Sequence, residues 1–178
     1  MHTHQIFDSI LDNNPLDEIK IIPVNKFILL DIITFGAYGV WWMYKSWLFF
    51  KKRNQLDITP SLRVLFAIFY LYELFDRIQK FASFHGYNKI YLPVILFISF
   101  FIFNTLAQLP NPFWLISIFG FVSLTPAVKA LNFGIMNCGD YHVVLEKNYN
   151  NRQILLLVVG GLLWIANLID VFSPHDKL

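Results

Sequence analysis

The chain has 178 residues, of which 56% are hydrophobic and only 15% are charged. A water-soluble domain carries roughly 25% charged residues, so this composition argues against a soluble fold and indicates a membrane protein. The formal net charge of +2 is too small for nucleic-acid binding through phosphate neutralisation, and the single cysteine, Cys138, excludes an intramolecular disulfide.

Residues 1–26 are expected to form a polar N-terminal tail, because their first charges are acidic and a secretory signal would begin with basic residues. A short amphipathic turn over residues 6–11 is the alternative. Residues 27–172 are predicted to form a single helical membrane domain, and residues 173–178 a C-terminal tail.

Five apolar stretches follow one another along this domain, and a spanning helix needs about 20 predominantly apolar residues. Four of the stretches are predicted to span the membrane, namely residues 27–50, 90–109, 113–131 and 154–172. The remaining stretch, residues 62–81, has an uncharged core of only nine residues.

This remaining stretch is predicted to form an amphipathic helix lying at the membrane surface. On a helical wheel its charged residues fall within an arc of about 140°. They are Arg63, Glu73, Asp76, Arg77 and Lys80. Thr59 and Pro60 before it are typical of a helix start. A chain in which this stretch also spans, giving five spans, is the alternative.

The distribution of lysine and arginine favours four spans. With four spans, 11 of these residues lie on the cytoplasmic side and 3 outside, whereas five spans give 8 against 6. The positive-inside rule therefore favours an all-α fold of four spanning helices with one interfacial helix, with both termini outside.

The sharpest local pattern is Thr-Phe-Gly-Ala-Tyr-Gly-Val-Trp-Trp at residues 34–42. Two glycines three residues apart either weaken the helix, so that it kinks and lines a cleft, or provide a notch for helix packing below a belt of aromatic residues.

This pattern and its continuation resemble a domain-of-unknown-function family of small bacterial integral-membrane proteins with a Thr-x-Gly-x-Tyr segment leading to tryptophan. The residues that carry the resemblance are Thr34, Gly36, Tyr38, Trp42, Trp47, Pro60 and Arg63. Ser61 and Leu62 depart from it, because bulky aromatics are expected there. The resemblance implies a multi-pass protein of the bacterial inner (cytoplasmic) membrane and brings no established activity.

The third predicted span carries small residues at spacings of 3, 4, 3 and 4. They are Gly120, Ser123, Ala127, Ala130 and Gly134. Small residues on one stripe allow helices to approach closely. The stripe is predicted to serve helix packing within the chain, with a seam between copies as the alternative.

Five polar residues fall near the predicted outer ends of the spans. They are Asp31, Asn104, Gln108, Asn167 and Asp170. One interpretation is an outer polar cluster in which two carboxylates hold a cation or relay a proton. The other is that each side chain reaches water at the headgroup level.

Recognisable catalytic motifs are missing from the sequence, and Cys138, Asp140 and His142 are too few for a metal site, so no cofactor or metal is expected. We expect a non-enzymatic, membrane-embedded binding or accessory protein. Its expected partners are the lipid bilayer and either further copies or another membrane protein, and not nucleic acid. The alternative is a small transporter or ion-conducting oligomer with Asp31 and Asp170 on a polar path, and a lipid-directed membrane enzyme ranks third.

Overall fold

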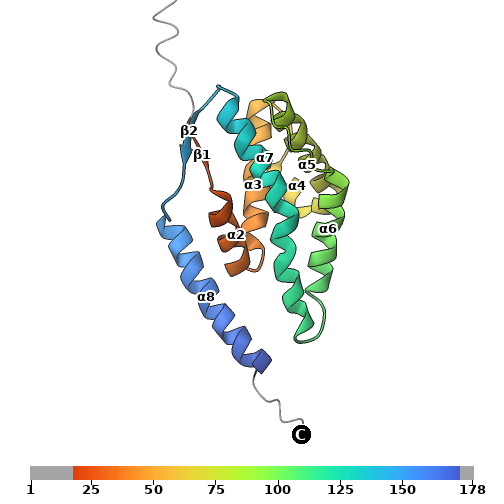
Figure 1. Cartoon of the computed structure of the whole chain (residues 1–178), viewed down its shortest axis with the longest axis vertical. Coiled ribbons are helices and arrows are strands. Elements are labelled where there is room, and N and C mark those ends of the chain that lie inside the picture. Colours follow the sequence, from red (N-terminus) through yellow and green to blue (C-terminus); the bar gives the residue numbers. More distant parts are fainter. Residues whose placement is uncertain (1–17, 173–178) are drawn as a thin grey trace, which may run out of the picture.

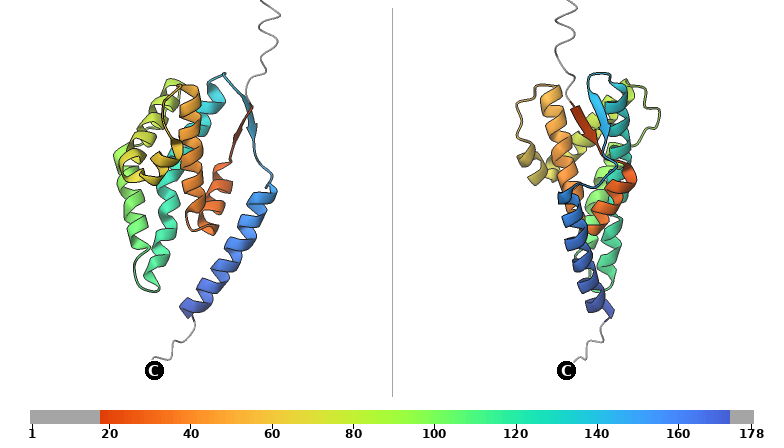
Figure 2. Two further views of the ribbon diagram at one scale, coloured as in Figure 1. Left: turned by 180° about the vertical axis from the view of Figure 1, so that it is seen from behind. Right: turned by 90° about the vertical axis from the view of Figure 1, so that its left-hand side faces the viewer.

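The computed structural model describes residues 18–172, which are mostly helical, so the predicted all-α class is confirmed in outline. Its elements in chain order are β1 (Glu18–Ile21), α2 (Val24–Ile33), α3 (Ala37–Arg53), α4 (Pro60–Leu65), α5 (Ala67–Phe84), α6 (Pro93–Leu106), the 3-10 helix η1 (Phe113–Gly120), α7 (Phe121–Asn137), β2 (His142–Leu145) and α8 (Asn151–Phe172). The β1–β2 ladder lies at one end of the helical bundle, and the α6–η1 loop lies at the other (Figures 1 and 2).

The first apolar stretch does not form one spanning helix, and that prediction is wrong. The chain turns after α2, and α3 runs back toward the ladder (Figure 1). Phe35 and Gly36 both have left-handed backbone angles, with φ of 51° and 86°. This conformation ends a helix, and glycine adopts it without steric cost. The stretch is therefore a helical hairpin.

The parallel β1–β2 ladder corrects the predicted placement of the N-terminal segment. Glu18 lies opposite His142, and Ile21 lies opposite Leu145. The four-span arrangement puts residues 20–26 and 135–153 on opposite sides of a membrane, which this backbone pairing excludes. The predicted tail also ends earlier, because β1 and the start of α2 occupy residues 18–26. Residues 1–17 and 173–178 lie outside the described residues.

Two helical segments of the described chain are long and apolar enough to cross a membrane, not the four or five predicted. They are Phe113–Asn137, with 25 residues, and Asn151–Val171, with 21. α6 is equally apolar but has 14 residues, which gives a length of about 21 Å. A hydrocarbon core is about 30 Å thick, so α6 alone falls short of it.

The predicted amphipathic helix is amphipathic but consists of two helices, because the chain bends at Phe66 between α4 and α5. α5 buries one stripe at helical spacing, made of Leu71, Leu74, Phe75, Ile78 and Ala82. Its charged residues lie outside this stripe, as the wheel predicts.

α7 is the central helix and packs against α2, α5 and α6. Four residues of the small-residue stripe, Ser123, Ala127, Ala130 and Gly134, are buried within the chain. A Cβ atom on Gly134 would come within 2.6 Å of the Phe81 ring on α5. The stripe thus serves packing inside the protein, and these four residues are not exposed for a seam between copies.

Candidate functional site

The turn between α2 and α3 is held by two side chains that cap the start of α3. The Thr34 hydroxyl donates to the Leu30 carbonyl at 2.7 Å and accepts from the backbone N–H of Tyr38 at 3.0 Å. The buried Asp31 carboxylate accepts from the backbone N–H of Gly39 at 2.6 Å. These N–H groups have no partner within the helix, and a carboxylate there also interacts favourably with the helix dipole.

The two glycines of the motif have different roles. Gly36 supplies the left-handed turn, whereas Gly39 provides space. A Cβ atom on Gly39 would lie 2.6 Å from Cδ1 of Leu124 and 2.8 Å from Oδ1 of Asp31. The motif therefore builds a capped hairpin that fits closely against α7, which is a full reversal and not the kink considered from the sequence.

The two motif tryptophans are core residues. Trp42 is 6% exposed and packs edge-on against Phe27 at 5.8 Å, and Trp47 is 1% exposed. Only Trp41 of this group is well exposed, at 48%. Trp42 and Trp47 are therefore too buried to belong to the predicted aromatic belt, and only the exposure of Trp41 is compatible with it.

A partly open cleft of about 990 Å³ lies beside this hairpin. Its walls come from β1, α3, α7, the segment that leads into α8, and the first turns of α8 itself. Thr34, Tyr38 and Trp42 of the motif line it. Its volume is in the range of ligand sites, and its lining combines apolar, aromatic and charged side chains.

The first turn of α8, which lines the cleft, is fixed by a reciprocal cap. The Asn150 side chain accepts from the backbone N–H of Gln153 at 2.9 Å, and the Gln153 side chain accepts from that of Asn150 at 3.1 Å. The buried Gln153 amide also donates to the Tyr38 hydroxyl at 3.5 Å and to Glu146 at 3.4 Å. The start of α8 is therefore held beside the start of α3.

A buried lysine connects the hairpin to the same segment. Lys26 is 6% exposed, and its ammonium group donates to the carbonyls of Glu146 at 2.9 Å and Asn148 at 2.7 Å. It also lies 4.9 Å from the centre of the Tyr149 ring. Asn132 of α7, which also lines the cleft, donates to the Ile22 carbonyl at 2.8 Å.

Basic side chains exceed acidic ones in the cleft. Among residues 18–172, no ion pair forms at Lys45, Lys52 or Arg152, all of which line it. Lys20, which also lines the cleft, is paired with Glu18 at 3.5 Å. Glu146 is the remaining carboxylate of the lining, so the cleft carries a positive excess.

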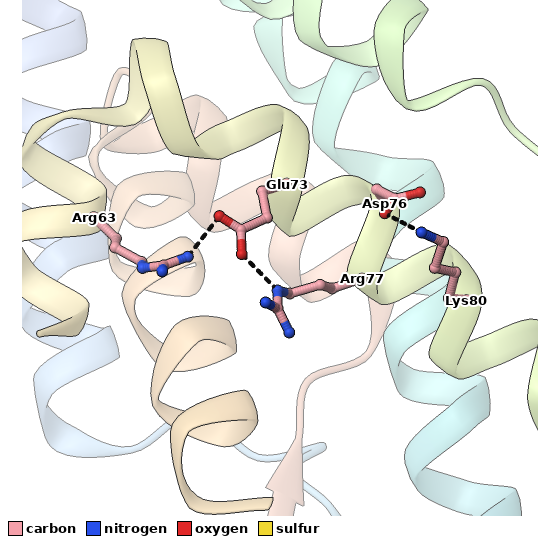
Figure 3. Close-up of polar contacts among 5 residues, drawn as sticks. All are labelled: Arg63, Glu73, Asp76, Arg77 and Lys80. Atoms are coloured by element: carbon pink, nitrogen blue, oxygen red, sulfur yellow. Dashed lines mark hydrogen bonds and ion pairs between the residues drawn. The ribbon is translucent and has the colours of Figure 1, made fainter. Parts of the chain in front are cut away.

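The charged residues of α4 and α5 form a separate cluster. Figure 3 shows Glu73 between two guanidinium groups, Arg63 at 2.7 Å and Arg77 at 2.8 Å, while Asp76 and Lys80 pair at 2.7 Å. Partial burial opposes ionisation of Glu73, but the bonds and charges of the two arginines outweigh it and hold the pKa of Glu73 below its usual value.

Arg63 joins this cluster to the core. Its guanidinium lies 4.4 Å from the centre of the Trp47 ring and 4.8 Å from that of Tyr70. Pro60, the first residue of α4, is buried. The second half of the sequence motif thus fastens α4 to α3 through a cation–π contact.

Within residues 18–172, the five predicted outer polar residues have different partners. Asp31 caps α3, and the side chains of Asn104 and Asn167 donate to carbonyls of their own helices. Asp170 accepts from Asn111, in the α6–η1 loop, at 3.4 Å. Gln108 is exposed near that loop.

α8 contacts the rest of the protein mainly at the α2–α3 turn. The Trp164 indole donates to the Ile32 carbonyl at 3.1 Å and stacks on Phe35 at 4.7 Å. A Cβ atom on Gly160 would collide with Ile33, whereas Gly161 has nothing within 4 Å. The cleft lies on the ladder side of this contact, so the contact fixes one of its walls.

Within residues 18–172, no three His, Cys, Asp or Glu side chains lie close enough to hold a metal ion. Cys138 donates to the Ile135 carbonyl at 3.2 Å, and Asp140 pairs with Arg53.

Lys52, Arg152 and Gln153 were not among the residues singled out from the sequence, yet they line the cleft. Two sequence signals point toward them. Trp41, Lys45, Leu48 and Lys52 follow the i, i+4, i+7, i+11 spacing of one helix face. Asn150 followed three residues later by Gln153 resembles a capping box.

Residues 18–172 thus form a helical fold that contains two helical segments long and apolar enough to cross a membrane, together with a cleft of mixed polar and apolar lining. No family model matches the chain, and neither a curated protein nor a solved structure matches it.

Proposed function

We propose that the protein is a non-enzymatic, membrane-embedded binding protein whose ligand site is the cleft between α3 and the start of α8. The cleft of about 990 Å³ is the observation that carries the proposal. Its lining suits an amphipathic ligand, since Trp41 and Leu156 lie in the same cleft as Lys45 and Arg152.

Exposed apolar surface supports a place in the membrane. Only 6% of the most apolar window of α8 is buried within the protein, and Leu162, Ile165 and Ile169 are each more than half exposed. A soluble protein rarely exposes so large an apolar face. We propose that α8, η1–α7, and α6 with its charge-free flanks cross the bilayer, while the α2–α3 hairpin enters from one side and returns.

The basic residues support this placement. In the four-span arrangement, 11 basic residues lie on the cytoplasmic side and Lys20 and Lys26 lie on the other. A hairpin that returns to its side of entry places Lys20 and Lys26 with those 11, so that 13 of the 14 basic residues share one side. The positive-inside rule makes this side the cytoplasm. The cleft then opens at the cytoplasmic surface, in the bacterial inner membrane that the family resemblance implies.

The transport alternative gains no support from the contacts of its two carboxylates. Asp31 accepts a hydrogen bond from the backbone of α3, and Asp170 accepts one from Asn111 near the far end of the bundle. Association with further copies or with another membrane protein remains part of the proposal, but the buried stripe on α7 does not supply the surface for it.

A bulky residue in the cleft tests the proposal. Ala37 lines the cleft and is exposed, so Ala37→Trp should fill the site without disturbing the core. Val40, on the same helix, is 46% exposed and does not line the cleft, so Val40→Trp is the matched control. Each protein is reconstituted in vesicles of equal parts phosphatidylglycerol and phosphatidylcholine, extracted in mild detergent and examined by native mass spectrometry.

Wild type and Val40→Trp should each retain one phospholipid per chain, and Ala37→Trp should retain on the order of tenfold less. Circular dichroism and size-exclusion profiles that match the wild type show that the variant is folded. Retention by Ala37→Trp equal to that of the wild type would contradict the proposed site.

A further inference from the structure

The cations of the cleft are placed to meet an extended anionic group. Lys45 and Lys52 lie seven residues apart on α3, which places them on one face about 10 Å apart along the helix. The bond between Gln153 and Tyr38 holds the start of α8, and Arg152 with it, beside the start of α3. Lys45, Lys52 and Arg152 therefore line one cleft.

The other basic residues of α3 have hydrogen-bond or ion-pair partners, whereas Lys45 and Lys52 have neither among residues 18–172. Lys51 donates to the Ile58 carbonyl at 2.7 Å, and Arg53 pairs with Asp140. Lys45 contacts the Trp41 ring at 5.3 Å, which leaves its N–H donors available, and Lys52 has no polar partner among residues 18–172. The unpaired cations of α3 are thus the ones that face the cleft.

The surroundings of these cations match an amphiphile that lies at a membrane surface. Arg152 and Leu156 are one helical turn apart on α8 and both line the cleft, which joins a charged position to an apolar one. Trp41 is 48% exposed beside Lys45, and an indole favours the headgroup region. Glu146 is held by the side chains of Asn150 and Gln153, so part of its charge is already satisfied.

We infer that the cleft binds an acidic phospholipid, with Lys45 and Arg152 contacting the phosphate, Lys52 extending the positive charge along the cleft, and Leu156 and Trp41 contacting the start of its acyl chains. The inference rests on the proposed function, because it names the ligand class of the same site. Arginine and lysine are the side chains that best match phosphate oxygens, and a membrane supplies such lipids at high local concentration.

Two triple variants that lose the same number of positive charges provide the test. One protein carries Lys45→Gln, Lys52→Gln and Arg152→Gln. The control carries Lys80→Gln, Lys89→Gln and Lys147→Gln, three exposed positions that do not line the cleft. Each is titrated in mild detergent with phosphatidylglycerol, with phosphatidylcholine and, as a soluble phosphate, with glycerol 3-phosphate, and bound species are counted by native mass spectrometry.

The wild type and the control should prefer phosphatidylglycerol over phosphatidylcholine by on the order of tenfold, and the cleft variant should lose that preference. Glycerol 3-phosphate should not compete at concentrations near that of the lipid. Equal preference in the cleft variant and the control would overturn the inference, and so would full competition by glycerol 3-phosphate.

The Ala37→Trp variant distinguishes a wrong ligand class from a wrong site. If it abolishes retention of both lipids while the cleft variant keeps its preference, the ligand class is wrong and the site stands. If Ala37→Trp changes nothing, the site itself is wrong.

Discussion

The contact between α8 and the hairpin can be tested with two neighbouring glycines. A Cβ atom on Gly160 would lie 2.5 Å from Cγ2 of Ile33 and would also collide with the Ile33 carbonyl oxygen, which belongs to the backbone of α2. A Cβ atom on Gly161 would have nothing within 4 Å. Both substitutions to alanine change the intrinsic helix preference equally, so the difference between them isolates the collision.

The expected difference follows from the contacts. Overpacking against a fixed backbone costs roughly 1–3 kcal/mol, and an outward shift of α8 would also weaken the hydrogen bond from Trp164 to Ile32, worth about 1 kcal/mol. Gly160→Ala should therefore be less stable than Gly161→Ala by roughly 2–4 kcal/mol.

Thermal unfolding of both variants in the same detergent measures the difference. Equal melting temperatures, or a more stable Gly160→Ala protein, would refute the close contact between α8 and α2.

Three further predictions concern the charged groups. Arg63→Lys should destabilise the protein by about 1 kcal/mol, because lysine lacks the planar group that contacts the Trp47 and Tyr70 rings. A double-mutant cycle of Arg63→Lys with Trp47→Leu should show an interaction energy between the two positions. Lys26→Met should cost roughly 1–3 kcal/mol in thermal unfolding, because two carbonyls lose their donor, and a loss as small as that of an exposed lysine would contradict this role. Folding lowers the pKa of Glu73 from its usual value of 4.5, so the ionised carboxylate contributes its full stabilisation above pH 4.5 and loses it as the pH falls through the lowered pKa. Glu73→Gln should therefore flatten the acidic part of the plot of unfolding free energy against pH. An unchanged plot would argue against the ion pairs.

Local features of the sequence predicted much of the helical structure. The hydrophobic runs indicate α7 and α8, and the charge arc separates the buried from the exposed side of α5. The spacing of small residues indicates which side of α7 packs against other helices, because small side chains are needed for close helix packing whatever the partner helix is.

The α2–α3 hairpin cannot be told from a single span by apolar length, because its stop signals lie within one continuous hydrophobic run. Thr34 and Gly36 are residues that cap and end helices, but they lie inside a long hydrophobic run that satisfies the length of a span. The β1–β2 pairing joins residues more than 120 positions apart, and no local pattern specifies such a partner. The cleft depends on both features, so its walls could not be assembled from the sequence.

The central claim is that the α2–α3 hairpin returns the chain to the side on which it entered, so that the cleft faces the cytoplasm. Single cysteines in place of Glu18, Asn111 and Asn148, in a Cys138→Ser background, can be labelled in intact cells with an impermeant maleimide. The hairpin predicts labelling at residue 111 and protection at residues 18 and 148 until the cells are opened. Labelling of residue 18 in intact cells, with residue 148 still protected, would contradict the hairpin and restore a first helix that spans.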